Sequence, residues 1–274
     1  MKIVLLVLIS ILSLNSMARA NRYIGGDEWT KPRITKSIFE NQNSIVTDLI
    51  LRTAKIVHNR THKVGTAFLF KETSESYIFL TNYHVLKGSR ECRNARILLV
   101  DENFKRHTLK CHKIIKEGKI SDGTDYTYFS IKKESKSDFL MKLGSLPLAK
   151  EKPIAGDRLV TVGFGNSKAT TRKYDASLGY DDDCLYLLGN KNILLKGELV
   201  KDVFFTGCDV ISGDSGSAIV NRDTGELVGL LFGAAEQKRS NPLSTSEINE
   251  FLGTSYLDFM TNSSLAIDIR SIAL

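Results

Sequence analysis

Short apolar segments recur along most of the chain and alternate with polar or turn-rich stretches. They are rich in Val, Ile, Phe, Tyr and Leu, and their fairly even spacing predicts the strands of an all-β sandwich or barrel. The polar stretch at 235–264 lacks this pattern. The expected strands are 54–57, 65–70, 77–81, 95–100 and 126–131 in a first set, and 158–163, 184–188, 192–195, 203–206, 217–221, 226–232 and 265–269 in a second.

A looser connection at 140–153, which holds two of the four prolines, separates the two sets of strands. Before the first set, Ser44 precedes apolar residues at helical spacing, and this predicts a short helix with Ser44 as its N-cap. The expected organisation is a polar, irregular lead-in at 21–43, a first β unit at 44–145 and a second β unit at 146–274.

The first 20 residues have the features of a signal peptide. Lys2 gives a positive start, residues 3–14 are apolar apart from two serines, and Ala18 and Ala20 suit cleavage after Ala20. The apolar run is shorter than the ~20 residues that span a bilayer, so we expect a secreted or periplasmic protein without stable membrane association. An uncleaved membrane anchor is the alternative.

The composition and charge of the chain limit the classes of partner that we expect it to bind. The chain is 42% hydrophobic and 25% charged, as globular domains usually are, and its formal net charge is +7. A basic chain favours acidic partners, but its Lys and Arg residues are scattered and no basic run is interleaved with aromatic residues. We therefore expect no nucleic-acid partner. We also expect the protein to be a monomer.

Four cysteines in a chain expected to be exported predict disulfides. Three pairings are possible, and the local one, Cys92–Cys111 with Cys184–Cys208, closes two short loops. No CxxC spacing occurs and no histidine stands near a cysteine pair, so we expect neither a metal nor a cofactor.

Two polar residues at the borders of expected strands are candidates for chemistry. His84 follows the strand at 77–81, although a single histidine is more often a surface or core residue. The other four histidines lie in polar contexts and are interpreted as surface groups; they are His58, His62, His107 and His112. Asp125 opens the strand at 126–131, where a carboxylate can be partly buried, with a turn aspartate as the alternative.

The third candidate is Ser215, within Gly213-Asp214-Ser215-Gly216-Ser217. Flanking glycines let the amides of Gly213 and Ser215 point at a substrate oxygen and form an oxyanion hole, whereas a glycine-rich turn is the plainer interpretation. The order His84, Asp125, Ser215 is that of chymotrypsin-type enzymes; α/β-hydrolases and subtilisins have different orders. We therefore predict a catalytic triad of these three residues.

These motifs resemble those of the chymotrypsin/trypsin-like serine peptidases, in the bacterial branch related to V8-like and Deg-type enzymes. The resemblance covers roughly 45–274 and is carried by the segments 65–69, 81–85, 156–163, 213–217 and 228–233. It implies an all-β fold of two six-stranded antiparallel barrels with short N- and C-terminal helical segments. His84 and Asp125 would then come from the first barrel and Ser215 from the second.

The chain also departs from the family. Val85 stands where the animal enzymes have a cysteine, Ala218 stands where they have a proline, and a PDZ-like extension is missing. Residues 23–26 resemble a zymogen activation site, although they lie unusually far from His84. Asp214 could pair with a processed N-terminal amine, as in zymogen-activated relatives, or could be hydrogen-bonded locally.

The resemblance also implies a substrate pocket. Asp209, six residues before Ser215, would form the base of the S1 pocket, with Val210, Leu231 and Ala234 beside it. A carboxylate there would favour Arg or Lys at P1, whereas a structural role beside Cys208 is the alternative. The predicted function is a serine endopeptidase that cleaves proteins or peptides through an acyl-enzyme. A catalytically inactive binding protein of the same fold and an esterase with the same triad are the alternatives.

Overall fold

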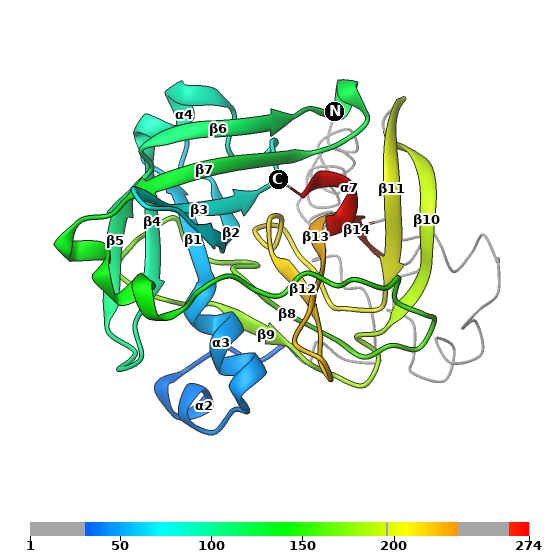
Figure 1. The fold of residues 1–274 in the computed structure, drawn as a ribbon, viewed down its shortest axis with the longest axis horizontal. Helices are drawn as coiled ribbons and strands as arrows, with labels where there is room; N and C mark the ends of the chain where they lie inside the picture. The colour runs from blue at the N-terminus through cyan, green and yellow to red at the C-terminus, as the bar shows by residue number, and fades with distance from the viewer. Residues whose placement is uncertain (1–30, 196, 235–262, 274) are drawn as a thin grey trace, which may run out of the picture.

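The computed structural model describes residues 31–195, 197–234 and 263–273, and its strands form two antiparallel sheets (Figure 1). The first sheet has the order β5-β4-β1-β2-β3-β7-β6. Its strands are β1 (Thr53–His58), β2 (Val64–Glu72), β3 (Ser76–Thr81), β4 (Ala95–Val100), β5 (Arg106–Lys110), β6 (Lys113–Gly118) and β7 (Tyr126–Lys132).

The second sheet has the order β10-β11-β14-β13-β12-β8-β9. Its strands are β8 (Leu159–Gly163), β9 (Ser177–Gly179), β10 (Tyr186–Leu195), β11 (Glu198–Thr206), β12 (Ala218–Asn221), β13 (Leu227–Ala234) and β14 (Ser264–Asp268). The all-β prediction is therefore confirmed, with the two sets of strands in separate sheets. The prediction missed β5, β6 and β9, since β5 and β6 are charged, largely exposed edge strands and β9 is very short.

In each sheet the two edge strands follow each other along the chain. Only Cys111 and His112 separate β5 from β6, and residues 180–185 separate β9 from β10. The chain thus bends from one edge of each sheet to the other within a few residues, and each sheet has seven strands where six were expected per barrel.

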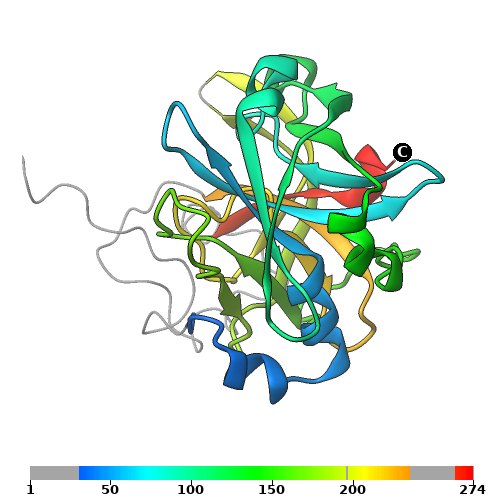
Figure 2. The same ribbon diagram turned by 90° about the vertical axis from the view of Figure 1, so that its left-hand side faces the viewer.

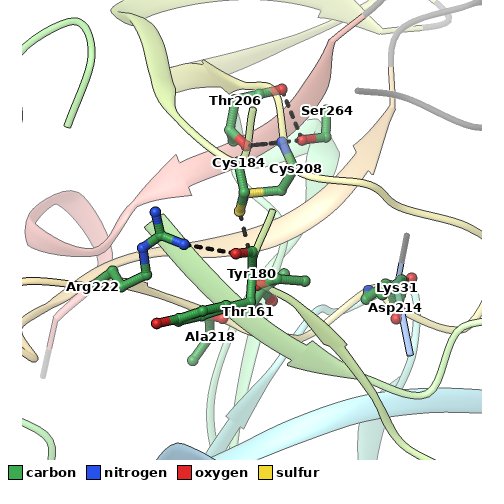
Figure 3. The surroundings of a disulfide bond; sticks show 11 residues. Lys31, Thr161, Tyr180, Cys184, Thr206, Cys208, Asp214, Ala218, Arg222 and Ser264 are labelled. Carbon is green, nitrogen blue, oxygen red and sulfur yellow. Dashed lines mark hydrogen bonds and ion pairs between the residues drawn. A yellow bond between two sulfur atoms is a disulfide. The ribbon is translucent and has the colours of Figure 1, made fainter. Parts of the chain in front are cut away.

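Both bends carry a disulfide. Cys111, at the first bend, is bonded to Cys92, and Cys184, at the second, is bonded to Cys208 (Figure 3). This is the local pairing among the three that the sequence allowed. Ser264 of β14 donates its hydroxyl hydrogen to the carbonyl of Thr206, close to the second disulfide. A covalent bond therefore fixes each point at which a strand changes direction.

A shared apolar core joins the two sheets. It contains Phe68 and Leu80 from the first sheet together with Val160 and Leu230 from the second, all fully buried. Each sheet also encloses an apolar cluster of its own, one around Phe79 and another that includes Ile219 and Phe204 among others. Because the same core supports both sheets, residues on the two facing edges keep a fixed relative position.

Short helices flank the sheets, as expected for both ends of the chain (Figure 2). They are α2 (Lys36–Glu40), α3 (Ser44–Arg52), α4 (Gly88–Asn94) and α7 (Ile269–Ile272), with 3₁₀ turns η1 (Ile120–Asp122) and η2 (Ser135–Lys142). The N-cap of α3 is Asn43 rather than the predicted Ser44, because the Asn43 side chain accepts the amide hydrogen of Val46. Among the described residues, no helix is long and apolar enough to cross a membrane.

Part of the segment expected to be an irregular lead-in is ordered against the second sheet. The amide of Ile34 donates to the carbonyl of Ala176, and the amide of Leu178 donates to the carbonyl of Pro32. Residues 31–34 therefore run alongside β9 before α2 begins. The expected signal peptide and the sequence at 23–26 lie outside the described residues.

Asp183, beside the second disulfide, is a buried carboxyl group. Its side chain is 2% exposed, and burial together with the neighbouring carboxylates raises its pKa to about 7. Aspartate in an unfolded chain titrates near ~3.9, so between these values the folded state keeps a proton that the unfolded state has lost. The free energy of unfolding should therefore fall as the pH rises from about 4 to 7.

Replacing Asp183 with asparagine should remove this dependence. We expect Asp183→Asn to raise the free energy of unfolding by on the order of 2 kcal/mol at pH 8 and to leave it nearly unchanged at pH 4. Urea denaturation at the two pH values measures this, with Asp138→Asn as the matched control, because Asp138 is exposed and is not among the carboxylates that act on Asp183. An equal gain at both pH values would contradict the assignment.

Candidate functional site

His84 and Asp125 form a tightly held pair at one edge of the first sheet. His84 lies in the turn after β3, with its side chain 39% exposed, and Asp125 directly precedes β7, with its side chain 1% exposed. Asp125 Oδ1 accepts the backbone amide hydrogen of His84 (3.0 Å), and Asp125 Oδ2 lies 2.5 Å from His84 Nδ1. A carboxylate on Nδ1 leaves Nε2 as the free acceptor, which is the state required of a general base.

Buried polar groups fix the turn that carries His84. The side-chain amide of Asn82 donates to the carbonyl of Asp125 (2.9 Å), and the hydroxyl of Thr127 donates to the carbonyl of Leu86 (3.0 Å). His58 Nε2 lies 2.8 Å from the carbonyl oxygen of Val85. His58 is buried, so its interpretation as a surface group is wrong: it lies at the end of β1, whose other residues are also buried.

The backbone around Ser215 adopts conformations that favour glycine. Gly213 has φ 108° and Gly216 has φ 92°. A Cβ at Gly216 would lie 1.9 Å from the carbonyl oxygen of Thr66, and one at Gly213 would lie 2.4 Å from that of Phe164. The two glycines therefore permit both the turn around Ser215 and its close approach to the rest of the protein.

Thr66 of β2 holds the Ser215 loop against the first sheet. Its amide donates to the carbonyl of Ser215 (2.9 Å) and its hydroxyl to the carbonyl of Gly213 (2.8 Å). Its own carbonyl accepts the hydroxyl hydrogen of Thr81, three residues before His84 (2.6 Å). These contacts bring the second-sheet serine loop to the strand end that leads to His84. Sequence reasoning missed this role, because Thr66 has the pattern of an ordinary strand residue.

The amides of Gly213 and Ser215, the pair expected to form the oxyanion hole, have no acceptor among the described residues. The neighbouring amide of Ser212 has none there either. The Ser215 hydroxyl is partly buried and also forms no hydrogen bond within the described structure. In unliganded enzymes the bond from a nucleophile to its base is often long and shortens when substrate binds.

A cavity of about 190 Å³ opens beside Ser215. The described residues that line it are Val210, Ile211, Ser212, Asp214, Ser215, Leu231, Gly233 and Ala234. Three of the four residues expected around the S1 pocket are therefore at this cavity. The fourth, Asp209, is fully buried next to Cys208 and is not among the lining residues.

Asp214 has both carboxylate oxygens occupied. Oδ1 accepts the amide hydrogen of Gly165 (2.8 Å) and Oδ2 accepts that of Ile211 (3.0 Å). Oδ2 also pairs with Lys31 Nζ at 3.0 Å. The structure thus combines local hydrogen bonds, one of the two expected arrangements, with a lysine ammonium that the sequence did not suggest.

The segment that contains the three candidate residues is similar to a known protein family. A family model described as a trypsin-like peptidase domain matches residues 65–230, which is more than half of the chain and includes His84, Asp125 and Ser215. No curated protein matches the sequence.

Similar solved structures include Deg5, with a TM-score of 0.54, 14% identity, and coverage of 87% of this chain and 93% of that one. A Glu endopeptidase in complex with MPD gives a TM-score of 0.55 at 12% identity, covering 89% and 93%. An inactive-form mutant of Rv3671c from M. tuberculosis H37Rv gives 0.51 at 19%, covering 89% and 94%. At such identities the likeness concerns the fold, and it agrees with the two-barrel expectation. Together with the family match, it identifies this chain as a member of the trypsin-like peptidase domain family.

Proposed function

We propose that this protein is a serine endopeptidase that uses Ser215 as nucleophile, His84 as general base and Asp125 to orient His84. The Ser215 oxygen forms a bond to the carbonyl carbon of the scissile peptide while His84 Nε2 takes the hydroxyl proton. The C–N bond then breaks, and His84 delivers the proton to the leaving amine. Water, deprotonated by His84, releases the acyl group and regenerates Ser215.

The pairing of His84 with a buried Asp125 carboxylate carries this proposal. A carboxylate that is 1% exposed and accepts two hydrogen bonds from one histidine fixes the tautomer and the orientation of the ring. An exposed histidine on a binding surface would have no need for such a partner. This favours catalysis over the inactive binding protein of the same fold.

The free amides of Gly213 and Ser215 would stabilise the oxyanion of the tetrahedral intermediate. Donors that are already in position lose little reorganisation energy, and each contributes ~2.7–4 kcal/mol to the transition state in related sites. We further propose that the protein acts outside the cytoplasm, because the sequence at 1–20 has the features of an export signal and two disulfides are present.

Labelling with a fluorophosphonate tests the catalytic assignment. Purified protein should form a covalent adduct that mass spectrometry places on Ser215, and it should cleave a denatured protein substrate. An adduct on another residue, or none in any form of the protein, would contradict the proposal. Hydrolysis of short acyl esters without cleavage of any peptide would favour the esterase.

For specificity we propose an apolar P1 side chain. The cavity beside Ser215 has aliphatic groups of Val210, Leu231 and Ala234 on its wall, and these suit a side chain without charge. A basic P1 residue, expected from the sequence position of Asp209, would require that carboxylate at the cavity. The same carboxylate is buried and is not among the lining residues.

A panel of peptide substrates that differ only at P1 decides between these preferences. We expect kcat/KM for Leu to exceed that for Arg by about tenfold, the scale on which an apolar pocket discriminates. Asp209→Asn should then leave the order unchanged. A preference for Arg that disappears in Asp209→Asn would instead establish the basic specificity.

A further inference from the structure

A buried ion pair lies directly behind the catalytic serine. Lys31 Nζ and Asp214 Oδ2 are 3.0 Å apart, and the two side chains are 0% and 1% exposed (Figure 3). Asp214 precedes Ser215 in the chain, whereas Lys31 comes from the segment before the first helix. Removing two charges from water is costly, so such a pair calls for a structural reason.

Two glycines leave the space that the Asp214 carboxylate occupies. A Cβ at Gly163 would lie 2.2 Å from Asp214 Oδ1, and a Cβ at Gly165 would lie 2.4 Å from Oδ2. The second barrel therefore leaves room for this carboxylate, which a side chain at either position would displace.

The carboxylate holds the loop that carries the catalytic groups. It accepts the amide hydrogens of Gly165 and Ile211, which lie on two separate segments, and Ile211 lines the cavity. Ile211 begins the stretch that includes Gly213 and ends at Ser215. Both proposed oxyanion donors thus depend on where Asp214 points, and the ammonium of Lys31 lies 3.0 Å from Oδ2 of this carboxylate.

The lysine is delivered by an internal stretch of chain. Residues 31–34 are hydrogen-bonded along β9 through Pro32 and Ile34, and Arg33 Nη2 donates to the carbonyl of Asn166 (3.2 Å). The backbone hydrogen bonds of residues 31–34 and the Arg33 side chain therefore fix the position of Lys31 Nζ. This placement does not require a free chain terminus.

We propose that Lys31 is a positioning residue whose ammonium holds Asp214 and thereby keeps Gly213 and Ser215 in their working arrangement. On this view no cleavage that creates a new α-amine is needed for activity. The inference rests on the proposed peptidase function, because it concerns the reactivity of Ser215.

The first test compares two buried lysines. Lys31→Met removes the charge at nearly constant size and should slow fluorophosphonate labelling of Ser215 at least tenfold, at a temperature where the variant is fully folded by circular dichroism. The control is Lys55→Met, because Lys55 is also 0% exposed and pairs with Asp175 at 2.8 Å. It should lower the melting temperature but label at close to the parental rate. Parental labelling of Lys31→Met, or an equal loss in both variants, would overturn the inference.

A double variant separates positioning from stability. Lys31→Met with Asp214→Asn leaves no unpaired charge, so the melting temperature should return towards that of the parent. Labelling should stay at least tenfold slow, because Gly165 and Ile211 donate to different oxygens of Asp214 and an asparagine has a donating NH2 group in place of one of them. If the melting temperature and the labelling rate both returned to the parental values, the Lys31–Asp214 pair would only stabilise the fold, and the inference would be overturned. This variant also keeps the test decisive if the single Lys31→Met variant does not fold.

The last test blocks the chain terminus. A fusion partner on the N-terminus, shown intact by mass spectrometry after the assay, should leave the rate of Ser215 labelling unchanged. Labelling only after removal of the fusion, with a new terminus upstream of Lys31, would overturn the inference while leaving the peptidase function in place. Absence of labelling in every form would contradict the peptidase function itself, and the inference with it.

Discussion

Replacing Ser215 with alanine is expected to lower kcat for peptide hydrolysis by about 10⁶-fold, the scale seen when a triad nucleophile is removed from such enzymes. Ser217, two residues further along, does not offer a replacement hydroxyl, because its hydroxyl donates to the carbonyl of Asp214 and the residue is fully buried. The Ser215 hydroxyl has no hydrogen-bond partner in the described structure, so its loss should hardly change the melting temperature.

The measurement is steady-state cleavage of a fluorescent peptide together with thermal unfolding. Ser89→Ala, at an exposed serine of α4, is the matched control and should behave like the parent. Residual activity within tenfold of the parent in Ser215→Ala would assign the nucleophile to another residue.

Replacing Asp125 with asparagine should lower kcat by about 10⁴-fold while preserving the fold. The asparagine amide cannot accept the hydrogen on His84 Nδ1, so the histidine is driven into the tautomer that carries its proton on Nε2. In that state His84 cannot take the proton of Ser215. Because the two side chains have the same shape, the buried site should stay packed.

Asp122→Asn is the matched control, because Asp122 lies on the same connection but is exposed. It should retain activity within a few-fold of the parent. The rate of peptide cleavage and the melting temperature of both variants check the expectation. A similar small loss in both variants would show that Asp125 does not orient His84.

The pattern of apolar segments was enough to predict two β units, and the observed strands fall into two sheets accordingly. Strands such as β1, β2 and β7 are almost wholly buried, so they are rich in the apolar residues that mark a strand. Edge strands bury little. β5 has one buried residue, Leu109, and its pattern therefore gave no signal.

The candidate triad could also be proposed from sequence, since each member borders a strand or a glycine-rich turn and the order of the three is distinctive. Sequence reasoning failed where one residue acts through another far away in the chain. Thr66 reads as a strand position, His58 as a polar surface residue and Lys31 as part of an irregular leader. Their roles arise from contacts with Ser215, Val85 and Asp214 respectively.

The sequence alone therefore determined the fold class, the candidate residues for acyl transfer and three possible pairings for the disulfides, because these depend on short-range periodicity, residue chemistry and count. Tertiary structure decided which buried polar groups meet. Only folding brings Lys31 to Asp214 and buries Asp209, which is not among the residues that line the cavity. The physical reason is that a buried charge or hydroxyl is stable only beside its partner, and that partner is chosen by packing of distant segments and not by spacing along the chain.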